Sequence, residues 1–384
     1  MAVVLPAPSD PKMARHFDVI VAGGGLVGLS IACGLTREGL RVAVCDEGEH
    51  GFCASRGNFG LIWVQGKGAD SPAYANLTAH SARLWPAFAE RLRGASGIDP
   101  ALAQPGGFSL YLDTGELAAK AALMNRIEAR APDFRHETLD AEGVRRHFPD
   151  VGPEVVGAIH TPHDGHVNPL KTLRALLIAF QAQGGVYLPR HHVANVETGA
   201  GVFTLSTAGG SLECGRFVLA AGLGNARLAP LVGLRAPVAP VRGQIMITER
   251  LPPFLPYPTS LIRQTDEGTV QIGESQEPEA GFDDGTRPDV LAGMARRAIR
   301  LFPRLRPARV VRAWGALRIM TPDALPLYEE SRSHPGAFVA SCHSGVTLAA
   351  AHHGIIAPWI AGKGGPGLAE DFHAERFTFQ TSAD

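Results

Sequence analysis

The sequence lacks an excess of charge of either sign. Its 36 Lys and Arg residues nearly cancel its 37 Asp and Glu residues, which leaves a formal net charge of −1 over 384 residues. A protein that grips nucleic acid through phosphates needs a basic surface, and this chain carries no basic arm. The composition therefore argues against a nucleic-acid partner.

Cysteine is scarce and carries no metal-binding spacing. The five cysteines are an odd number with no C-x-x-C pair, so they form neither a zinc or iron–sulfur signature nor a secreted disulfide framework. Met1–Lys12 also lacks the basic start of a secretory signal. We therefore expect no metal and a reducing, cytoplasmic location. The cysteines are Cys33, Cys45, Cys53, Cys214 and Cys342.

One long segment, Ala337–Gly362, lacks Asp, Glu, Lys and Arg altogether. It nevertheless contains three histidines, several glycines and Pro358, which interrupt the roughly 20 apolar residues that a membrane-spanning helix requires. A buried strand followed by a buried helix explains the segment better. We therefore predict no transmembrane segment here.

What the chain does have is enough apolar material for about two domains. Hydrophobic residues make up 45% and charged residues 19% of the sequence, as in folded soluble proteins. The 45 glycines and 29 prolines follow no triplet period. We interpret them as tight turns and close backbone approaches.

The first part of the chain predicts a βαβ unit. Phe17–Ala22 and Arg41–Cys45 are apolar, β-branched runs typical of buried parallel strands, and Leu26–Thr36 between them is typical of a helix. Arg216–Ala221 and Ala337–Ser341 have the same character. We expect all four runs in one parallel sheet.

The intervening segments predict a second, antiparallel domain. Val241–Thr248 and Thr269–Gly273 alternate as half-buried strands, and Phe108–Leu112 followed by Asp113–Gly115 indicates a hairpin arm. The predicted amphipathic helices are Leu77–Leu92, Leu117–Ala129, Leu170–Gln183 and Pro288–Leu301.

A nucleotide-binding motif joins the first strand to the first helix. Gly23, Gly25 and Gly28 fit G-x-G-x-x-G, in which the glycines permit a tight turn, backbone approach to a pyrophosphate and close helix–strand packing. Asp46 ends the second strand 18 residues after Gly28, close to the spacing for a ribose-binding carboxylate. NAD and FAD share this pattern, and a glycine turn without a nucleotide is the alternative.

Four later segments give the chain a family resemblance. Cys53–Gly68 (CASRGNFGLIWVQGKG), His191-His192-Val193, Phe217–Asn225 (FVLAAGLGN) and Trp314–Pro326 (WGALRIMTPDALP) occur in the order found in the D-amino-acid oxidase family. The chain resembles that family from Phe17 to Gly362. A plain glycine-rich loop remains the alternative for the first of these segments.

The resemblance implies an α/β fold with a Rossmann-like FAD-binding domain and an antiparallel substrate domain, similar to glycine oxidase. The implied division is an FAD-binding domain at 15–80, 145–232 and 315–365, a substrate domain at 81–144 and 233–314, a flexible extension at 1–14 and a tail at 366–384. The implied cofactor contacts are Gly23, Gly25, Gly28, Asp46, Glu47, Ser55, Arg56, Asn58, Phe59, Gly60, Leu61, Val193, Ala221 and Gly222.

Arg318 is the implied substrate-binding residue, because a planar guanidinium can hold a carboxylate through two parallel hydrogen bonds. A structural ion pair with Asp323 or another acid is the alternative. The loop before the last helix, two residues shorter than is typical of the family, implies flavin contacts from Ser344, Gly345, Val346 and Thr347. In that loop His343 is a catalytic candidate or a packed loop residue. Ala316 stands where some relatives attach flavin through cysteine, so we expect non-covalent FAD.

A cluster of histidines offers a weaker hypothesis. His160, His163, His166 and Asp164 lie close enough in sequence to suggest a metal site. The same piece resembles the family's turn before the helix that starts at Asn168–Pro169. We favour the turn.

The resemblance implies oxidation of a small amino acid or secondary amino acid by hydride transfer from Cα to FAD. The run Asn58–Gly68 is most similar to catalytic FAD subunits of D-hydroxyproline dehydrogenase and of opine (octopine, nopaline) oxidase complexes, which implies partner subunits with further redox centres. One alternative is a stand-alone glycine or sarcosine-type oxidase that makes peroxide. Another is a flavin subunit that only relays electrons.

Overall fold

The computed structural model describes residues 16–48, 54–131, 133–199, 201–273, 275–365 and 367–377. The expected extension 1–14, Cys53 and the end of the expected tail lie outside these ranges.

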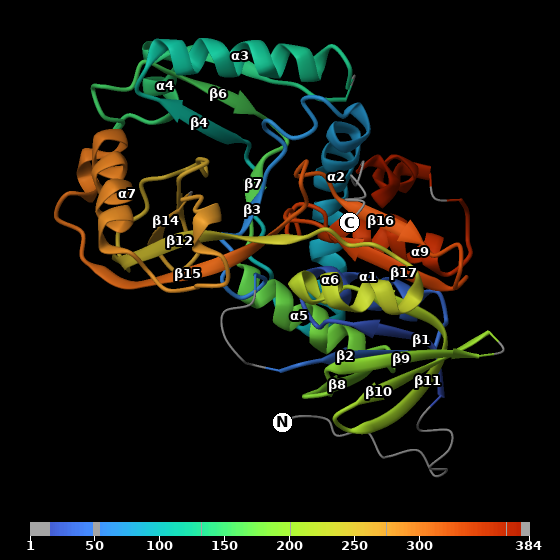
Figure 1. The fold of residues 1–384 in the computed structure, drawn as a ribbon. Helices are drawn as coiled ribbons and strands as arrows, with labels where there is room; N and C mark the ends of the chain where they lie inside the picture. Colours follow the sequence, from blue (N-terminus) through green and yellow to red (C-terminus); the bar gives the residue numbers. More distant parts are fainter. Residues whose placement is uncertain are drawn as a thin grey trace.

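A mostly parallel sheet forms the right and lower right of the molecule in Figure 1. Its strands lie in the order β16-β17-β11-β1-β2-β8, and the four predicted runs pair in parallel within it, as expected. β9 and β10 continue from β11 as an antiparallel meander, and β16 pairs antiparallel with β17. The bounds are β1 His16–Ala22, β2 Val42–Asp46, β8 Val186–Pro189, β9 Val193–Gly199, β10 Val202–Thr207, β11 Gly210–Leu219, β16 Leu327–Glu330 and β17 Ala337–Ser341.

Alternation along β1 gives this sheet two apolar faces. Val19 and Val21 pack in one core with Leu29 and Trp85, whereas Ile20 packs in another core with Phe203. Helices cover the first face, and β9, β10 and the short helix α6 cover the second. The helices are α1 Leu26–Arg37, α2 Pro72–Ser96, α5 Pro169–Ala182 and α6 Asn225–Leu228.

The uncharged segment forms a buried strand and a buried helical stretch, as predicted. After β17 the chain continues through α8 (Ala349–Ala351), a π-helical turn (His352–Ile356) and α9 (Ala357–Ile360). α9 packs so closely on α1 that a Cβ at Gly34 would lie 2.4 Å from the Ala357 Cβ. Across the described ranges, no helix is both long and apolar enough to cross a bilayer.

Antiparallel sheets build the other side of the molecule. Long strands β12 (Ala239–Arg250) and β15 (Val310–Met320) pair along their length, and β14 (Thr269–Ile272) and β13 (Ile262–Gln264) follow β12 outward. A three-stranded sheet of β4, β6 and β5 shares their core, beneath α3 at the top of Figure 1. The remaining bounds are β3 Leu61–Ile62, β4 Gly107–Tyr111, β5 Glu137–Asp140, β6 Gly157–Thr161, β7 Gly165–His166, α3 Thr114–Glu128, α4 Ala141–His147 and α7 Pro288–Leu301.

Short 3₁₀ turns complete the described elements, and two of them follow the last helix. They are Gly222–Gly224, Ala229–Val232, Pro278–Ala280, Pro303–Leu305, Gly367–Phe372 and Ala374–Arg376. Helix α2 and strand β15 each run across an expected domain boundary, so the proposed division of the chain remains a prediction.

The predicted hairpin arm at Phe108–Leu112 is wrong. This run forms β4, but its antiparallel partner is β6, some fifty residues later in the chain. Asp113 does not turn the chain back; its side chain accepts a hydrogen bond from the Glu116 N–H at 2.9 Å and caps α3. Asp favours both turns and helix N-caps, which explains the error.

We predict that Asp113→Ala lowers the free energy of unfolding by about 1 kcal/mol, because α3 loses its N-terminal hydrogen-bond acceptor. Asp113→Asn is the matched control and should keep most of the stability, since its side-chain oxygen accepts the same bond. Urea unfolding of the FAD-loaded protein measures both. Equal loss in the two variants would contradict the assigned cap.

Candidate active site

The turn between β1 and α1 has no room for side chains. Gly23 has φ +110°, and a Cβ there would lie 2.3 Å from the carbonyl oxygen of Ala220. A Cβ at Gly28 would lie 1.9 Å from the carbonyl oxygen of Gly23, and one at Gly25 would lie 2.8 Å from the Ser55 Oγ. Backbone therefore forms this edge of the sheet, where α1 begins.

Asp46 stabilises the turn from the end of β2. Its Oδ2 accepts from the Gly24 N–H at 2.6 Å, and its Oδ1 accepts from the Gly48 N–H at 2.9 Å. The Tyr187 hydroxyl also donates to Oδ1 at 3.4 Å, so the remaining acceptor capacity for a ribose hydroxyl lies on Oδ2. Ser55 contributes from the other side, where its Oγ accepts from the Leu26 N–H at 2.9 Å.

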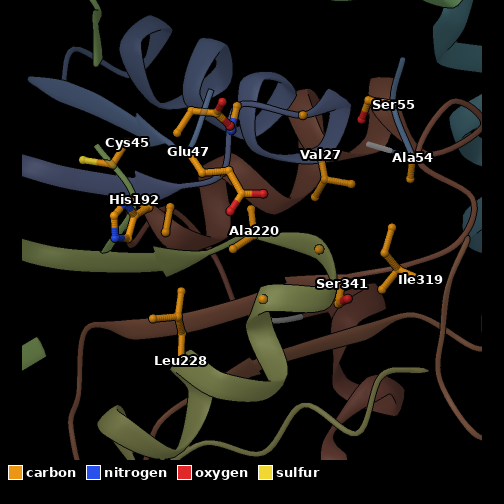
Figure 2. A pocket seen from close by; sticks show the side chains of 18 of the residues that line it. Val27, Cys45, Glu47, Ala54, Ser55, His192, Ala220, Leu228, Ile319 and Ser341 are labelled. Carbon is orange, nitrogen blue, oxygen red and sulfur yellow. The ribbon is translucent and has the colours of Figure 1, made fainter. Parts of the chain in front are cut away.

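A first pocket lies beside this turn (Figure 2). In the view of Figure 2, Cys45 and His192 lie at one end of the pocket, and Ser55 and Ile319 at the other. The predicted residues that line it are Gly23, Gly25, Asp46, Glu47, Ser55, Arg56, Val193, Ala221 and Gly222.

A second pocket continues from the first. Val27, Ala54, Ser55, Ile319 and Cys342 line both, so the two form one elongated cleft. The predicted residues in the second pocket are Ser55, Asn58, Phe59, Leu61, Arg318, His343, Ser344, Gly345, Val346 and Thr347. The structure thus brings together the segment that leads into β3, strand β15 and the loop before α8.

Two predicted cofactor contacts lie outside the linings of both pockets. Gly28 packs directly against the Gly23 carbonyl of the turn. Gly60 has φ +90°, and a Cβ there would lie 2.5 Å from the Val167 carbonyl oxygen. We assign these two glycines to backbone packing beside the cleft.

Arg318 reaches the second pocket from β15. Its Nη1 donates to the Ser275 carbonyl at 2.8 Å, and the guanidinium covers Gly243 so closely that a Cβ there would lie 2.2 Å from Nη1. The carboxylate of Asp323, named as a possible ion-pair partner, binds Arg376 at 2.7 Å. The Ser275 carbonyl and the backbone of β12 at Gly243 therefore orient the guanidinium.

The loop before α8 forms the opposite wall and is anchored from α2. Ser81 Oγ donates to the Thr347 carbonyl at 2.7 Å, and Trp85 Nε1 donates to the Val346 carbonyl at 3.1 Å. Burial, and then the charges of Lys67 and Arg318, lower the pKa of His343 to about 3. His343 is therefore a neutral imidazole at physiological pH.

Lys67 is the functional candidate that sequence reasoning missed. It lines the second pocket, and its Nζ donates to the Ser344 Oγ, which also lies 2.7 Å from the Tyr74 hydroxyl. Burial lowers the pKa of Lys67 to about 8. A lysine between two glycines is typical of an exposed loop, and its partner lies 277 residues away, so no local signal marks it.

The histidine cluster makes contacts other than metal coordination. Asp164 is buried, and its oxygens accept from the Val64 N–H at 2.6 Å and the Gln65 Nε2 at 2.8 Å. The His160 ring stacks on Phe108 with ring centroids 4.4 Å apart. His166 Nδ1 lies 3.1 Å from Arg263 Nη1. Asp164 therefore supports the 63–67 loop, which leads to Lys67.

The thiols that line the cleft are poor nucleophiles. Cys45 lines the first pocket and Cys342 lines both. Burial raises the pKa of each to about 12, so both remain protonated at neutral pH. This environment favours a flavin held without a thioether bond.

The cleft fits a flavin dinucleotide. The first pocket presents backbone, the N-terminus of α1 and the Asp46 carboxylate, which suit a pyrophosphate and a ribose. The second pocket adds room for a ring system beside Arg318. The geometry defines a dinucleotide-dependent oxidoreductase.

Comparisons identify the family. The DAO family model, described as FAD dependent oxidoreductase, matches residues 18–359, so the chain belongs to this family and uses FAD. The chain is 45% identical to a subunit of opine oxidase from Agrobacterium tumefaciens (strain Ach5) and 42% identical to the corresponding opine oxidase subunit from Rhizobium meliloti; each match covers 94% of this chain and 98% of the relative. The solved structure of glycine oxidase from Geobacillus kaustophilus aligns with TM-score 0.84 at 26% identity, over 91% of this chain and 96% of that one.

We predict that Gly28→Ala purifies without most of its FAD, because the added Cβ would displace the Gly23 carbonyl and open the turn. Gly94→Ala is the control, since its Cβ would meet nothing within 4 Å. Flavin absorbance of the supernatant after acid precipitation measures the content. Full FAD in Gly28→Ala would contradict the role of the turn, and colour left on precipitated wild type would contradict non-covalent binding.

Proposed function

We propose that this chain oxidises a secondary amino acid of the opine type, as the catalytic subunit of a hetero-oligomeric dehydrogenase. D-amino acids and hydroxyproline are the related substrates. The observation that carries the proposal is the second pocket, which continues from the FAD cleft and is lined by Arg318, Lys67 and His343. A pocket filled by apolar side chains would have favoured an electron relay; an open pocket with Arg318 in its lining favours a bound substrate.

The relatives support the opine type. The two relatives reported above at more than 40% identity are both named as opine oxidase subunits. An opine is a secondary amine that joins two carboxylate-bearing carbons. Such a substrate presents a carboxylate to Arg318 and a Cα–H beside the amine.

The pocket residues have separable roles in this proposal. FAD, when bound, accepts the hydride that leaves the substrate Cα. Arg318 holds the substrate carboxylate and thereby orients Cα. Burial, and then the charges of Lys67 and Arg318, disfavour the protonated His343 imidazole. The same surroundings disfavour a protonated amine, and a neutral amine is the form that can release hydride. The neutral His343 contributes a hydrogen-bonding wall without adding charge.

The proposed partner subunits follow from the fate of the electrons. A dehydrogenase must pass two electrons onward, and an iron–sulfur relay needs a cage of thiolates. Cys33, Cys45, Cys214 and Cys342 are buried as free thiols in the described part of the chain. A further redox centre therefore belongs on another chain, in agreement with the word subunit in the names of both relatives.

We predict that anaerobic addition of an opine bleaches the FAD of the wild-type protein, and that Arg318→Ala slows this step. Loss of the charged carboxylate partner should cost about 2–4 kcal/mol of transition-state binding, or roughly 30- to 1000-fold in kcat/KM. Stopped-flow absorbance with D-amino acids, proline analogues and opines measures the preference.

Two variants make the test specific. Gly243→Ala should displace the Arg318 guanidinium and also slow bleaching, whereas exposed Arg297→Ala should not. FAD content should stay at the wild-type level in all three. If Arg318→Ala bleached as fast as wild type, Arg318 would be structural; if no opine bleached wild type, the opine type would be wrong.

We predict that the chain expressed alone uses oxygen slowly with its best substrate but reduces an artificial dye. The electrons then lack their natural outlet on a partner chain. Peroxide formation and dye reduction are followed in parallel. Rapid stoichiometric peroxide would instead support a stand-alone oxidase, a function suggested by the similarity to glycine oxidase.

A further inference from the structure

The second pocket is lined by cations from two separate elements. Arg318 stands on β15, and Lys67 stands on the loop between β3 and α2. Arg318 alone accounts for one carboxylate in the proposed function. Lys67 has no role in it.

Lys67 reaches the pocket wall with its ammonium group. Its Nζ donates to the Ser344 Oγ, and the Ser344 hydroxyl is in turn fixed by Tyr74 at 2.7 Å and by His343 Nε2 at 3.1 Å. The Ser344 hydroxyl, fixed by these two side chains, holds the ammonium in place but does not neutralise it. An ammonium needs an anion to offset its lost hydration when it is taken out of water.

Asp164 is a buried carboxylate whose charge opposes the lowering of the Lys67 pKa by burial. The oxygens of Asp164 accept from Val64 and Gln65, three and two residues before Lys67. Burial raises the pKa of Asp164 to about 7. Asp164 therefore positions the loop that carries Lys67 and is only partly ionised at neutral pH, and Lys67 itself lines the second pocket.

The two cations lie in the lining of the same pocket. His343 also lines this pocket. Burial, and then the charges of Lys67 and Arg318, lower the pKa of His343. A bound molecule beside His343 is therefore within reach of both charges. A ligand with two carboxylates could contact both cations.

We propose that Lys67 binds the second carboxylate of a dicarboxylate secondary amine, while Arg318 binds the carboxylate next to the carbon that is oxidised. This inference rests on the proposed function and narrows it to N-(carboxyalkyl) amino acids. Lys67 is thereby the residue that selects these substrates over N-alkyl amino acids with a single carboxylate.

The test compares two substrates that differ by one carboxylate, N-(1-carboxyethyl)alanine and N-ethylalanine. In Lys67→Met the ratio of their kcat/KM values should fall by about 30- to 100-fold in favour of N-ethylalanine, because the charge-assisted contact is lost. Lys67→Arg keeps the charge and should keep the ratio within a few-fold. Lys171→Met, which removes an exposed lysine paired with Asp266, is the control.

A binding measurement without turnover separates this inference from the proposed function. Thiodiacetate and (methylthio)acetate have no amine, and their Kd values follow from the change that they cause in the FAD spectrum. Lys67→Met should weaken thiodiacetate about 30- to 100-fold and (methylthio)acetate far less. Lys67→Gln repeats the measurement if Lys67→Met loses FAD.

The outcomes are distinguishable. If wild type oxidises neither amine, the proposed function fails, and the thiodiacetate titration still decides the role of Lys67. If wild type oxidises the dicarboxylate but Lys67→Met leaves the substrate ratio and the Kd ratio unchanged, the assignment of Lys67 is wrong.

Discussion

The whole cleft depends on a steric constraint at the carboxyl edge of the parallel sheet. The Gly23 carbonyl, the Gly28 Cα and the Ala220 carbonyl meet there with no space for a Cβ. The absence of side chains exposes backbone N–H groups at the start of α1, where an anionic dinucleotide is favoured by the helix terminus. The first pocket begins at this edge, and the second pocket continues from it.

The second pocket is held by elements other than the glycine turn. Register pairing of β12 with β15 sets Arg318 opposite Val241, and Gly243 leaves space for its guanidinium. The facing loop comes from the parallel-sheet side and is held by Ser81 and Trp85 of the long helix α2. The pocket thus lies where the two sheet systems meet, so its shape depends on both.

Much of this architecture was predictable because the signals are local. Apolar β-branched runs specified β1, β2, β11 and β17, and the period of Pro288–Leu301 gave the bounds of α7. The glycine spacing and Asp46 likewise placed the turn and the carboxylate beside one pocket. In each of these cases the residues act within one short segment of chain.

The errors have a different physical origin. Asp113 fits both a turn and a helix cap, and only the pairing of β4 with distant β6 decides between them. Lys67 was overlooked because its surroundings are made by Ser344, Tyr74 and Asp164, which no sequence spacing connects to it. Tertiary contacts determine whether a charged side chain is solvated or buried.

The loop before α8 connects Lys67 with the second pocket. In the structure Ser344 of this loop accepts a hydrogen bond from the Lys67 ammonium. Residues of this loop and of β15 line the same pocket. Lys67 in the lining makes this pocket suitable for an anionic part of a ligand, because a cation in a partly dry site favours a ligand group of opposite sign.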